Sequence, residues 1–118
     1  MHGVPKDLDL TSMIGTRLDS ITFAEFTIGL TFDDGHRFSV FGQMKFRNQK
    51  GKELEQGTPS EMRQETQLSS LVGDRVKGIE MNPPTSITIV FSSERCIELI
   101  DNGSPYEAFL VEPEGIVV

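Results

Sequence analysis

The residues of this chain that could perform acid–base chemistry are gathered in one short stretch, Asp33-Asp34-Gly35-His36. An aspartate and a histidine within hydrogen-bonding reach can act as general base and general acid. The same four residues are typical of a hairpin tip, where Asp and Gly fit the turn. A nucleophile would have to come from a second turn, at Ser92 or Ser93. The stretch therefore predicts a turn, and we assign no catalytic residue.

Ligands for a metal or a cofactor are scarce. Cys96 is the single cysteine, and His2 and His36 are the two histidines. One cysteine excludes an intrachain disulfide and a cysteine-based zinc site. A calcium loop needs about six oxygens, usually spread over a longer loop than Asp33-Asp34. We expect no metal and no cofactor. A catalytic role for the Cys96 thiol would require His36 beside it, and an inert, half-buried thiol is the expectation.

Four basic residues surround an aromatic side chain between residues 45 and 52, namely Lys45, Phe46, Arg47, Lys50 and Lys52. Basic and aromatic residues in alternation can bind single-stranded nucleic acid. Lysines also protect an exposed strand edge from pairing with other chains. The net charge of −7 disfavours nucleic acid, because lysine and arginine neutralise the phosphates. We therefore predict a guarded edge strand and no nucleic-acid partner.

A β-hairpin positions the Asp33–His36 turn. Ile28, Leu30 and Phe32 alternate with small residues, which is the period of a half-buried strand. Asp33-Asp34-Gly35 then fits a three-residue loop whose glycine takes the left-handed conformation. This loop predicts that Leu30 pairs with Phe38 and Ile28 with Val40, so that the apolar side chains share one face.

The hairpin recurs later in the chain. The segment that begins Ile14-Gly15 resembles the one that begins Val72-Gly73, 58 residues further on. Such self-similarity predicts one supersecondary unit used twice. The second copy pairs Ile89 with Ile97 and Ile87 with Leu99. Glu94 stands where Gly35 stands in the first copy, so the conformation of the second loop stays open. A strand ahead of each hairpin, at Ile21 and Phe23 and at Ile79 and Met81, makes each unit a three-stranded antiparallel meander.

The remaining segments complete a mainly β (α+β) fold. Thr58, Pro59 and Glu61 form a helix-start signature, which predicts a helix from Thr58 to about Ser70. A short turn at Leu10–Met13 is its counterpart, and Tyr106–Val111 reads as the last strand. We predict about eight strands as a sandwich or a flattened barrel, with one helix between the two meanders. The chain, 1–118, is then a single domain with unit one at about 13–47, linker and helix at about 48–71, and unit two at about 72–111.

The chain of 118 residues is long enough for one domain with one core. No apolar run approaches the roughly 20 residues that a membrane-spanning helix needs. The first residues contain no apolar stretch of the kind that a secretory signal has. These observations predict a cytoplasmic protein with no membrane partner.

Acidic residues are concentrated in the second half. Residues 1–58 carry seven basic and eight acidic side chains, whereas residues 59–118 carry four basic and ten acidic ones. An acidic half can steer a basic partner toward it, or can simply keep the protein soluble. Tyrosine is favoured as an interface anchor, although Tyr106 can equally pack the end of the core. The candidate partner-binding residues are Glu98, Asp101, Tyr106, Glu107, Glu112 and Glu114.

The repeated pattern Ile14-Gly15-x-x-Leu18-x-x-Ile21, continued by Leu30-x-Phe32-x-Asp34-Gly35, resembles a family of small bacterial domains of unknown function. That family has repeated LxGxxV…LxFxDG units and a terminal Tyr-Glu-x-aromatic strand, here Tyr106–Phe109. Some similar acidic proteins neutralise secreted toxins as immunity proteins. The resemblance covers most of the chain and implies a fold, without a catalytic residue.

The resulting hypothesis is a non-enzymatic protein-binding module of the immunity or toxin-neutralising kind, with a basic protein as its partner. A self-associating structural module is the alternative, in which the Met44–Arg47 strand edge pairs across a two-fold axis into a homodimer. A small-molecule binder or enzyme with a pocket around His36 or Cys96 is the third.

Overall fold

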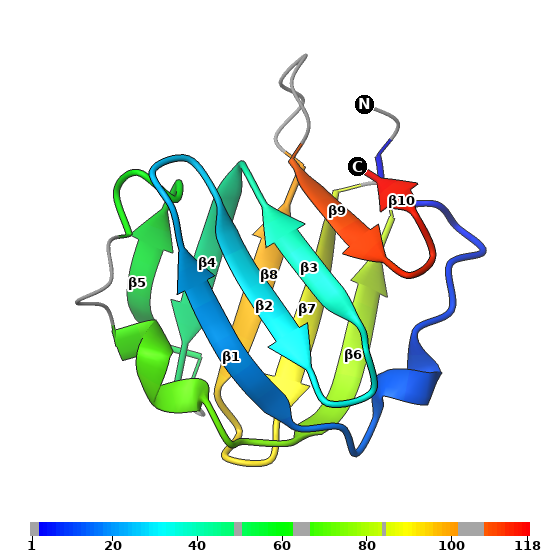
Figure 1. Cartoon of the computed structure of the whole chain (residues 1–118), viewed down its shortest axis with the longest axis horizontal. Coiled ribbons are helices and arrows are strands. Elements are labelled where there is room, and N and C mark those ends of the chain that lie inside the picture. The colour runs from blue at the N-terminus through cyan, green and yellow to red at the C-terminus, as the bar shows by residue number, and fades with distance from the viewer. Residues whose placement is uncertain (1–2, 49–50, 63–66, 84, 102–107) are drawn as a thin grey trace.

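Two five-stranded antiparallel sheets face each other in the computed structural model, which describes residues 3–48, 51–62, 67–83, 85–101 and 108–118 (Figure 1). The first sheet has the order β1-β2-β3-β9-β10, and the second has the order β5-β4-β8-β7-β6. The strands are β1 (Leu18–Phe23), β2 (Ile28–Phe32), β3 (Arg37–Val40), β4 (Gln43–Arg47), β5 (Glu53–Gly57), β6 (Val76–Asn82), β7 (Ser86–Phe91), β8 (Cys96–Ile100), β9 (Phe109–Glu112) and β10 (Ile116–Val117). Two short 3₁₀ helices are η1 (Thr11–Met13) and η2 (Gln67–Leu71).

The two predicted meanders are present, as β1-β2-β3 and β6-β7-β8. Leu30 pairs with Phe38 in the first, and Ile89 pairs with Ile97 in the second, which is the predicted register. Their apolar side chains are buried between the sheets, because alternate residues of a strand point to the same face. The predicted sandwich of two antiparallel meanders is therefore confirmed.

Each sheet is completed by a hairpin from the other half of the chain. The β9–β10 hairpin joins the first sheet through β3, where Phe109 pairs with Val40. The β4–β5 hairpin joins the second sheet through β8, where Met44 pairs with Leu99. The amides of Phe41 and Gly42 both donate to the carbonyl oxygen of Ala108, at 2.8 and 2.9 Å. The two halves thus exchange hairpins and interlock.

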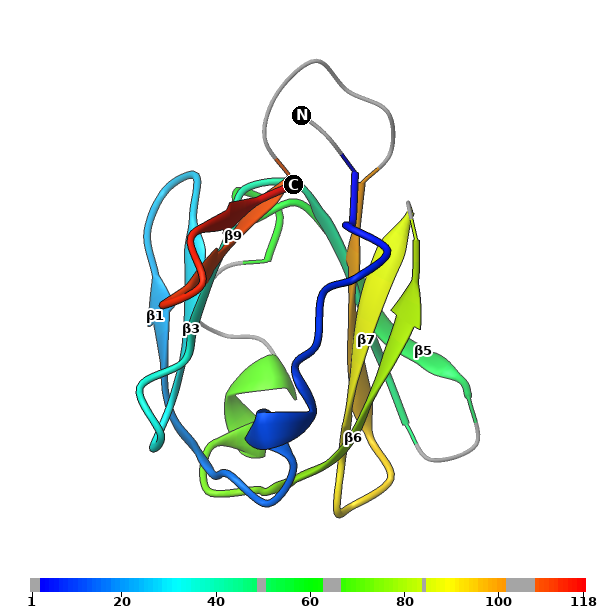
Figure 2. The same ribbon diagram turned by 90° about the vertical axis from the view of Figure 1, so that its right-hand side faces the viewer.

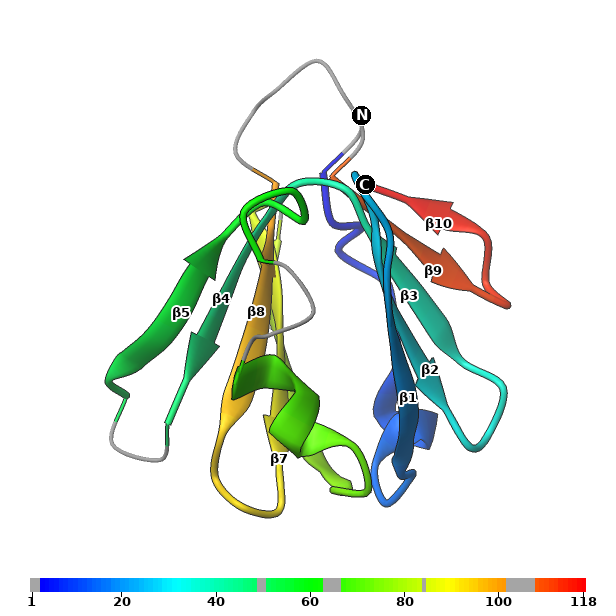
Figure 3. The same cartoon turned by 60° about the vertical axis from the view of Figure 1, so that its left-hand side comes forward.

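The core lies between the sheets and draws on both halves. Phe32 and Phe38 meet edge to face, with ring centroids 6.0 Å apart. Figure 2 shows η1 at one opening between the sheets, and Figure 3 shows η2 at the other. The segments that contain η1 and η2 contribute buried side chains at the same spacing along the chain. These are Val4, Leu10 and Met13 from the first segment and Met62, Leu68 and Leu71 from the second. These two segments therefore close the sandwich.

The prediction of a helix from Thr58 to about Ser70 is wrong for the residues that the structure describes. The capping signature does form a turn, because the Thr58 amide and hydroxyl both donate to Glu61 Oε1, at 2.8 and 2.9 Å. The turn does not continue as an α-helix, and Gln67–Leu71 is a five-residue 3₁₀ helix. Residues 63–66 lie outside the described residues. Apolar residues at 62, 68 and 71 are too sparse for the continuous apolar face that stabilises a surface helix.

The Met44–Arg47 segment is a strand, but its prediction as an exposed edge is wrong. β4 lies between β5 and β8. Its basic residues therefore face acids on the neighbouring strands: Lys45 lies 3.3 Å from Glu53, and Arg47 lies 2.7 Å from Glu98. The strand β5 escapes prediction because its sequence, Glu-Leu-Glu-Gln-Gly, contains a single large apolar residue. β10 escapes it because it is two residues long.

The edge strands β1 and β6 each carry a β-bulge. The register shifts between Leu18 and Ser20 in β1, and between Val76 and Gly78 in β6. The extra residue is charged in both strands: Asp19 in the first and Lys77 in the second. Bulges and charges interrupt the regular row of donors and acceptors that an incoming strand needs. Both edges are thus poor templates for pairing with another chain.

The second hairpin loop has the same conformation as the first, although Glu94 replaces glycine. The φ angle is +71° at Glu94 and +95° at Gly35. The loops also share a hydrogen bond, from Gly35 N–H to the Phe32 carbonyl and from Glu94 N–H to the Phe91 carbonyl. A side chain in the left-handed region costs about 1 kcal/mol. The ion pair of Glu94 with Lys77 is half-exposed, so it offsets little of this cost.

We therefore expect the substitution Glu94→Gly to raise the free energy of unfolding by about 0.5–1 kcal/mol. Gly35→Ala, at the corresponding position, should lower it by about 1 kcal/mol. Urea denaturation followed by circular dichroism measures both values. A loss of stability in Glu94→Gly would show that the contact with Lys77 outweighs the backbone strain.

Candidate functional site

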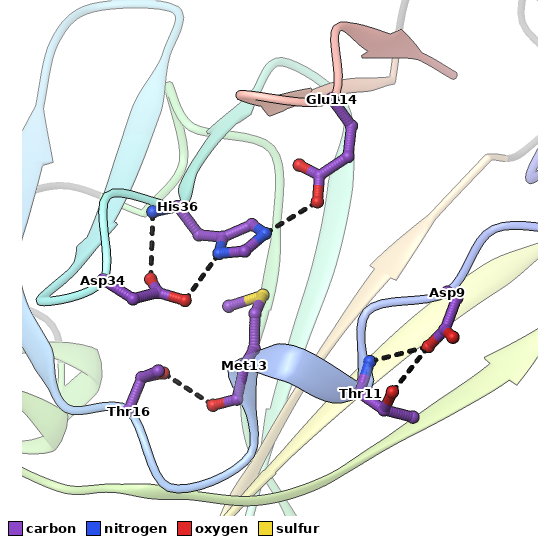
Figure 4. Close-up of polar contacts among 7 residues, drawn as sticks. All are labelled: Asp9, Thr11, Met13, Thr16, Asp34, His36 and Glu114. Carbon is purple, nitrogen blue, oxygen red and sulfur yellow. Dashed lines mark hydrogen bonds and ion pairs between the residues drawn. The ribbon is translucent and has the colours of Figure 1, made fainter.

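His36 is the buried centre of a polar cluster at one corner of the first sheet. His36 is only 7% exposed. Nδ1 lies 2.6 Å from Asp34 Oδ2, and Nε2 lies 2.7 Å from Glu114 Oε2 (Figure 4). Asp34 belongs to the β2–β3 turn and Glu114 to the β9–β10 turn. His36 therefore joins two turns whose residues are 78 positions apart in the sequence.

Backbone geometry brings these three side chains together. Asp34 Oδ1 accepts a hydrogen bond from the His36 amide at 3.0 Å, which fixes the carboxylate beside the ring of its own turn. The β9–β10 turn lies near His36 because β9 pairs with β3, with Glu112 opposite Arg37. Glu114 follows two residues later and reaches the far side of the imidazole. The β3–β9 register thus determines the cluster.

The geometry favours the protonated form of His36. A neutral imidazole has one N–H, and only the imidazolium can donate from both nitrogens to ionised carboxylates. Burial on its own lowers the pKa of His36, but the hydrogen bonds to Glu114 and Asp34 outweigh burial and raise the pKa above its ordinary value. The side chain of Met13, from η1, lies beside the ring in Figure 4. The two carboxylates therefore favour the imidazolium form of His36.

The Asp33–His36 stretch is confirmed as a turn, and its histidine forms a contact between turns. The His36 contact places acidic residues of both turns at one place, which we call the acidic corner: Asp33, Asp34, Glu112 and Glu114. All four residues are exposed. Asp33 Oδ1 also accepts from the Arg17 amide at 3.0 Å. Hydrogen bonds thus hold the carboxylates of Asp33, Asp34 and Glu114 in place, and Glu112 lies at the end of β9.

The six predicted partner-binding residues are only partly brought together. Glu112 and Glu114 meet at the acidic corner. Glu98 lies on β8 of the second sheet and pairs with Arg47. Asp101 follows β8, and its amide donates to the Thr85 carbonyl at 2.8 Å. Tyr106 and Glu107 lie outside the described residues.

Cys96 is half-buried on the outer face of β8, since its neighbour Ile97 points into the core. Its side chain contacts the guanidinium of Arg47. Burial lowers the pKa of Arg47, but hydrogen bonds to Glu98 and Cys96 outweigh burial and raise the pKa above its ordinary value. His36 lies at the corner of the other sheet, so the predicted alternative in which it meets Cys96 is wrong.

Sequence reasoning did not find the link between Asp34, His36 and Glu114, because no local pattern reports the β3–β9 register. It also did not single out Phe26, which lies in the β1–β2 loop and is 68% exposed. An apolar residue inside a short polar loop, Ala24-Glu25-Phe26-Thr27, was the available signal.

Comparison with known proteins gives no match: no family model, no curated protein and no solved structure is significantly similar to this chain. Across the described residues, no group of three or more His, Cys, Asp and Glu side chains has the arrangement of a metal site. No helix in the described part of the chain is long and apolar enough to span a membrane.

Proposed function

We propose that this chain is a non-enzymatic protein-binding module whose acidic corner receives a basic protein partner. The observation that carries the proposal is the 2.7 Å contact of His36 with Glu114, because it gathers the carboxylates of two distant turns. Within this class, the sequence resemblance favours an immunity protein, which would neutralise a toxin by covering a basic surface.

The electrostatics of the corner support this function. Glu112 is exposed at the end of β9, and Asp33 is exposed at the tip of the β2–β3 turn. Exposed carboxylates at fixed positions attract a partner of opposite charge and orient it, and they act mainly on the association rate. The overall charge of −7 acts in the same direction.

The surroundings of the two most reactive side chains support a role without catalysis. Both ring nitrogens of His36 are occupied by carboxylates. A general base needs a free nitrogen that faces the substrate. Cys96 contacts Arg47, and a catalytic thiol would need a base within reach.

We expect the double variant Asp33→Asn/Glu112→Gln to bind a decalysine peptide at least about fivefold more weakly at low salt, because two exposed charges contribute about 0.5–1 kcal/mol each. Asparagine keeps the oxygen that accepts from the Arg17 amide. Isothermal titration calorimetry at two salt concentrations measures the effect, which should shrink as salt screens the charges.

The matched control is Glu25→Gln/Glu80→Gln, which removes the same charge from exposed positions on the β1–β2 loop and β6. It should leave the affinity of the peptide within about twofold of the original. Equal weakening in both double variants would show that net charge alone attracts the peptide, and the proposed site would be rejected.

A further inference from the structure

The β9–β10 hairpin has a weak attachment at its outer end. β10 is two residues long, and in the described residues it pairs with β9 alone. Val118 donates to the Phe109 carbonyl at 2.9 Å, which closes the open end of the hairpin. At the turn, the contact of Glu114 with His36 ties the hairpin to the β2–β3 turn.

We propose that His36 is a proton-dependent latch, which holds the β9–β10 turn against the first sheet when doubly protonated and releases it on losing a proton. The latch concerns the internal motion of the hairpin, so it does not rest on the proposed binding function. It adds a pH-dependent conformational role to the histidine whose contact with Glu114 gathers the two turns.

Deprotonation releases one particular carboxylate. When the imidazolium gives one proton to water, the neutral ring keeps a single N–H. One carboxylate then faces a nitrogen lone pair. Asp34 cannot withdraw, because its other oxygen accepts from the His36 amide within the same turn. Glu114 lies in the turn beyond Glu112, the last residue of β9 that pairs with β3, so Glu114 is the carboxylate that leaves.

The charged groups that face His36 all raise its pKa. Asp34 approaches from its own turn and Glu114 from the β9–β10 turn, and both favour the imidazolium. The side chain from η1 is Met13, which carries no charge. Arg37, the next residue, turns away to donate to Thr31 Oγ1 at 3.1 Å.

The sign of the pH dependence follows. The pKa of His36 is raised in the folded protein. The stabilisation by the latch is therefore fully present below the unfolded-state pKa and is lost as the pH rises through the folded-state pKa. The latch is therefore closed on the acidic side of this transition and open on its alkaline side.

The second meander provides an internal comparison for the latch, because it has no histidine at the corresponding position. In the second meander, Arg95 occupies the position of His36: its Nε donates to Ser93 Oγ at 3.0 Å, and its Nη1 donates to Ser70 Oγ at 2.6 Å. Arginine keeps its charge throughout the accessible pH range. The β4–β5 hairpin is the structural counterpart of β9–β10 and carries no histidine.

The test uses the full chain and two NMR measurements. Nitrogen shifts of the His36 ring should report protons on both Nδ1 and Nε2 at pH 6. Hydrogen exchange between pH 6 and 10, corrected for the intrinsic rate, should show about tenfold loss of protection at the amide of Ile116, which pairs with Val111 beside the turn. Such a loss corresponds to one charged hydrogen bond. The amides of β5 should show no such change.

Two variants sharpen the test. Glu114→Gln removes the charge but keeps an acceptor oxygen, so the His36 pKa should fall and the change at Ile116 should move to lower pH. Glu80→Gln, on β6, should move neither. A neutral His36 ring at pH 6, a transition unchanged by Glu114→Gln, or an equal loss of protection in β5 would each overturn the latch.

Discussion

Replacement of Phe38 by alanine is expected to lower the free energy of unfolding by about 3–5 kcal/mol. The ring is fully buried and meets Phe32 edge to face. Phe38 lies on β3, where the hairpin from the second half joins the first sheet, opposite Val111. Loss of the ring leaves a cavity at the junction of both halves, which the interlocked sheets cannot close. Guanidinium denaturation followed by circular dichroism measures the change.

Phe26→Ala is the matched control, since it deletes the same ring from an exposed loop. It should change the free energy of unfolding by less than about 0.5 kcal/mol. If both substitutions cost the same, the distinction between a buried core and an exposed loop at these two positions would be wrong.

The second large effect is expected for Gly73→Val, which should lower the free energy of unfolding by about 2 kcal/mol. Gly73 has a φ of +95°, a region that a β-branched residue strongly disfavours. Its amide donates to the Leu18 carbonyl at 2.8 Å, and Gly15 makes the corresponding bond to the Val76 carbonyl. Any shift of the backbone to relieve the strain would break this link between the halves. Thermal unfolding by calorimetry measures the loss.

Gly78→Val provides the comparison at a glycine that needs no special conformation. Gly78 lies on the edge strand β6, and a Cβ there would meet nothing within 4 Å. Valine favours strands, so this variant should be neutral or up to about 1 kcal/mol more stable. Comparable losses in both variants would mean that the positive φ of Gly73 is not the cause.

The hairpins could be predicted from the sequence, but the way they combine could not. Period-two alternation and a three-residue turn define the pairing of Leu30 with Phe38 completely, because both signals are local. The partner of Met44 on β4 is Leu99, far along the chain. Alternation gives the face that Met44 presents but not the strand beside it, so β4 was taken for an edge.

The sequence identifies the residues of the site but not their meeting, because the meeting depends on pairing between distant strands. Glu112 and Glu114 stood out by their charge, and Asp34 and His36 by their chemistry. Their meeting depends on β3 pairing with β9 in one register, and a shift by one residue would turn Glu112 to the other face. The sequence predicts Glu98 as a partner-binding residue but does not reveal its ion pair with Arg47, because Arg47 comes from the exchanged β4–β5 hairpin.

The exchange of hairpins has a consequence for synthesis on the ribosome. The first sheet contains β1 to β3 from the beginning of the chain, yet two of its five strands, β9 and β10, are made last. Pairing across such a separation closes a long loop before it is stabilised, which slows folding. The first meander must therefore emerge with its apolar face uncovered. All strands of the second sheet have been made once β8 has been made, whereas the first sheet is complete only after β10 has been made.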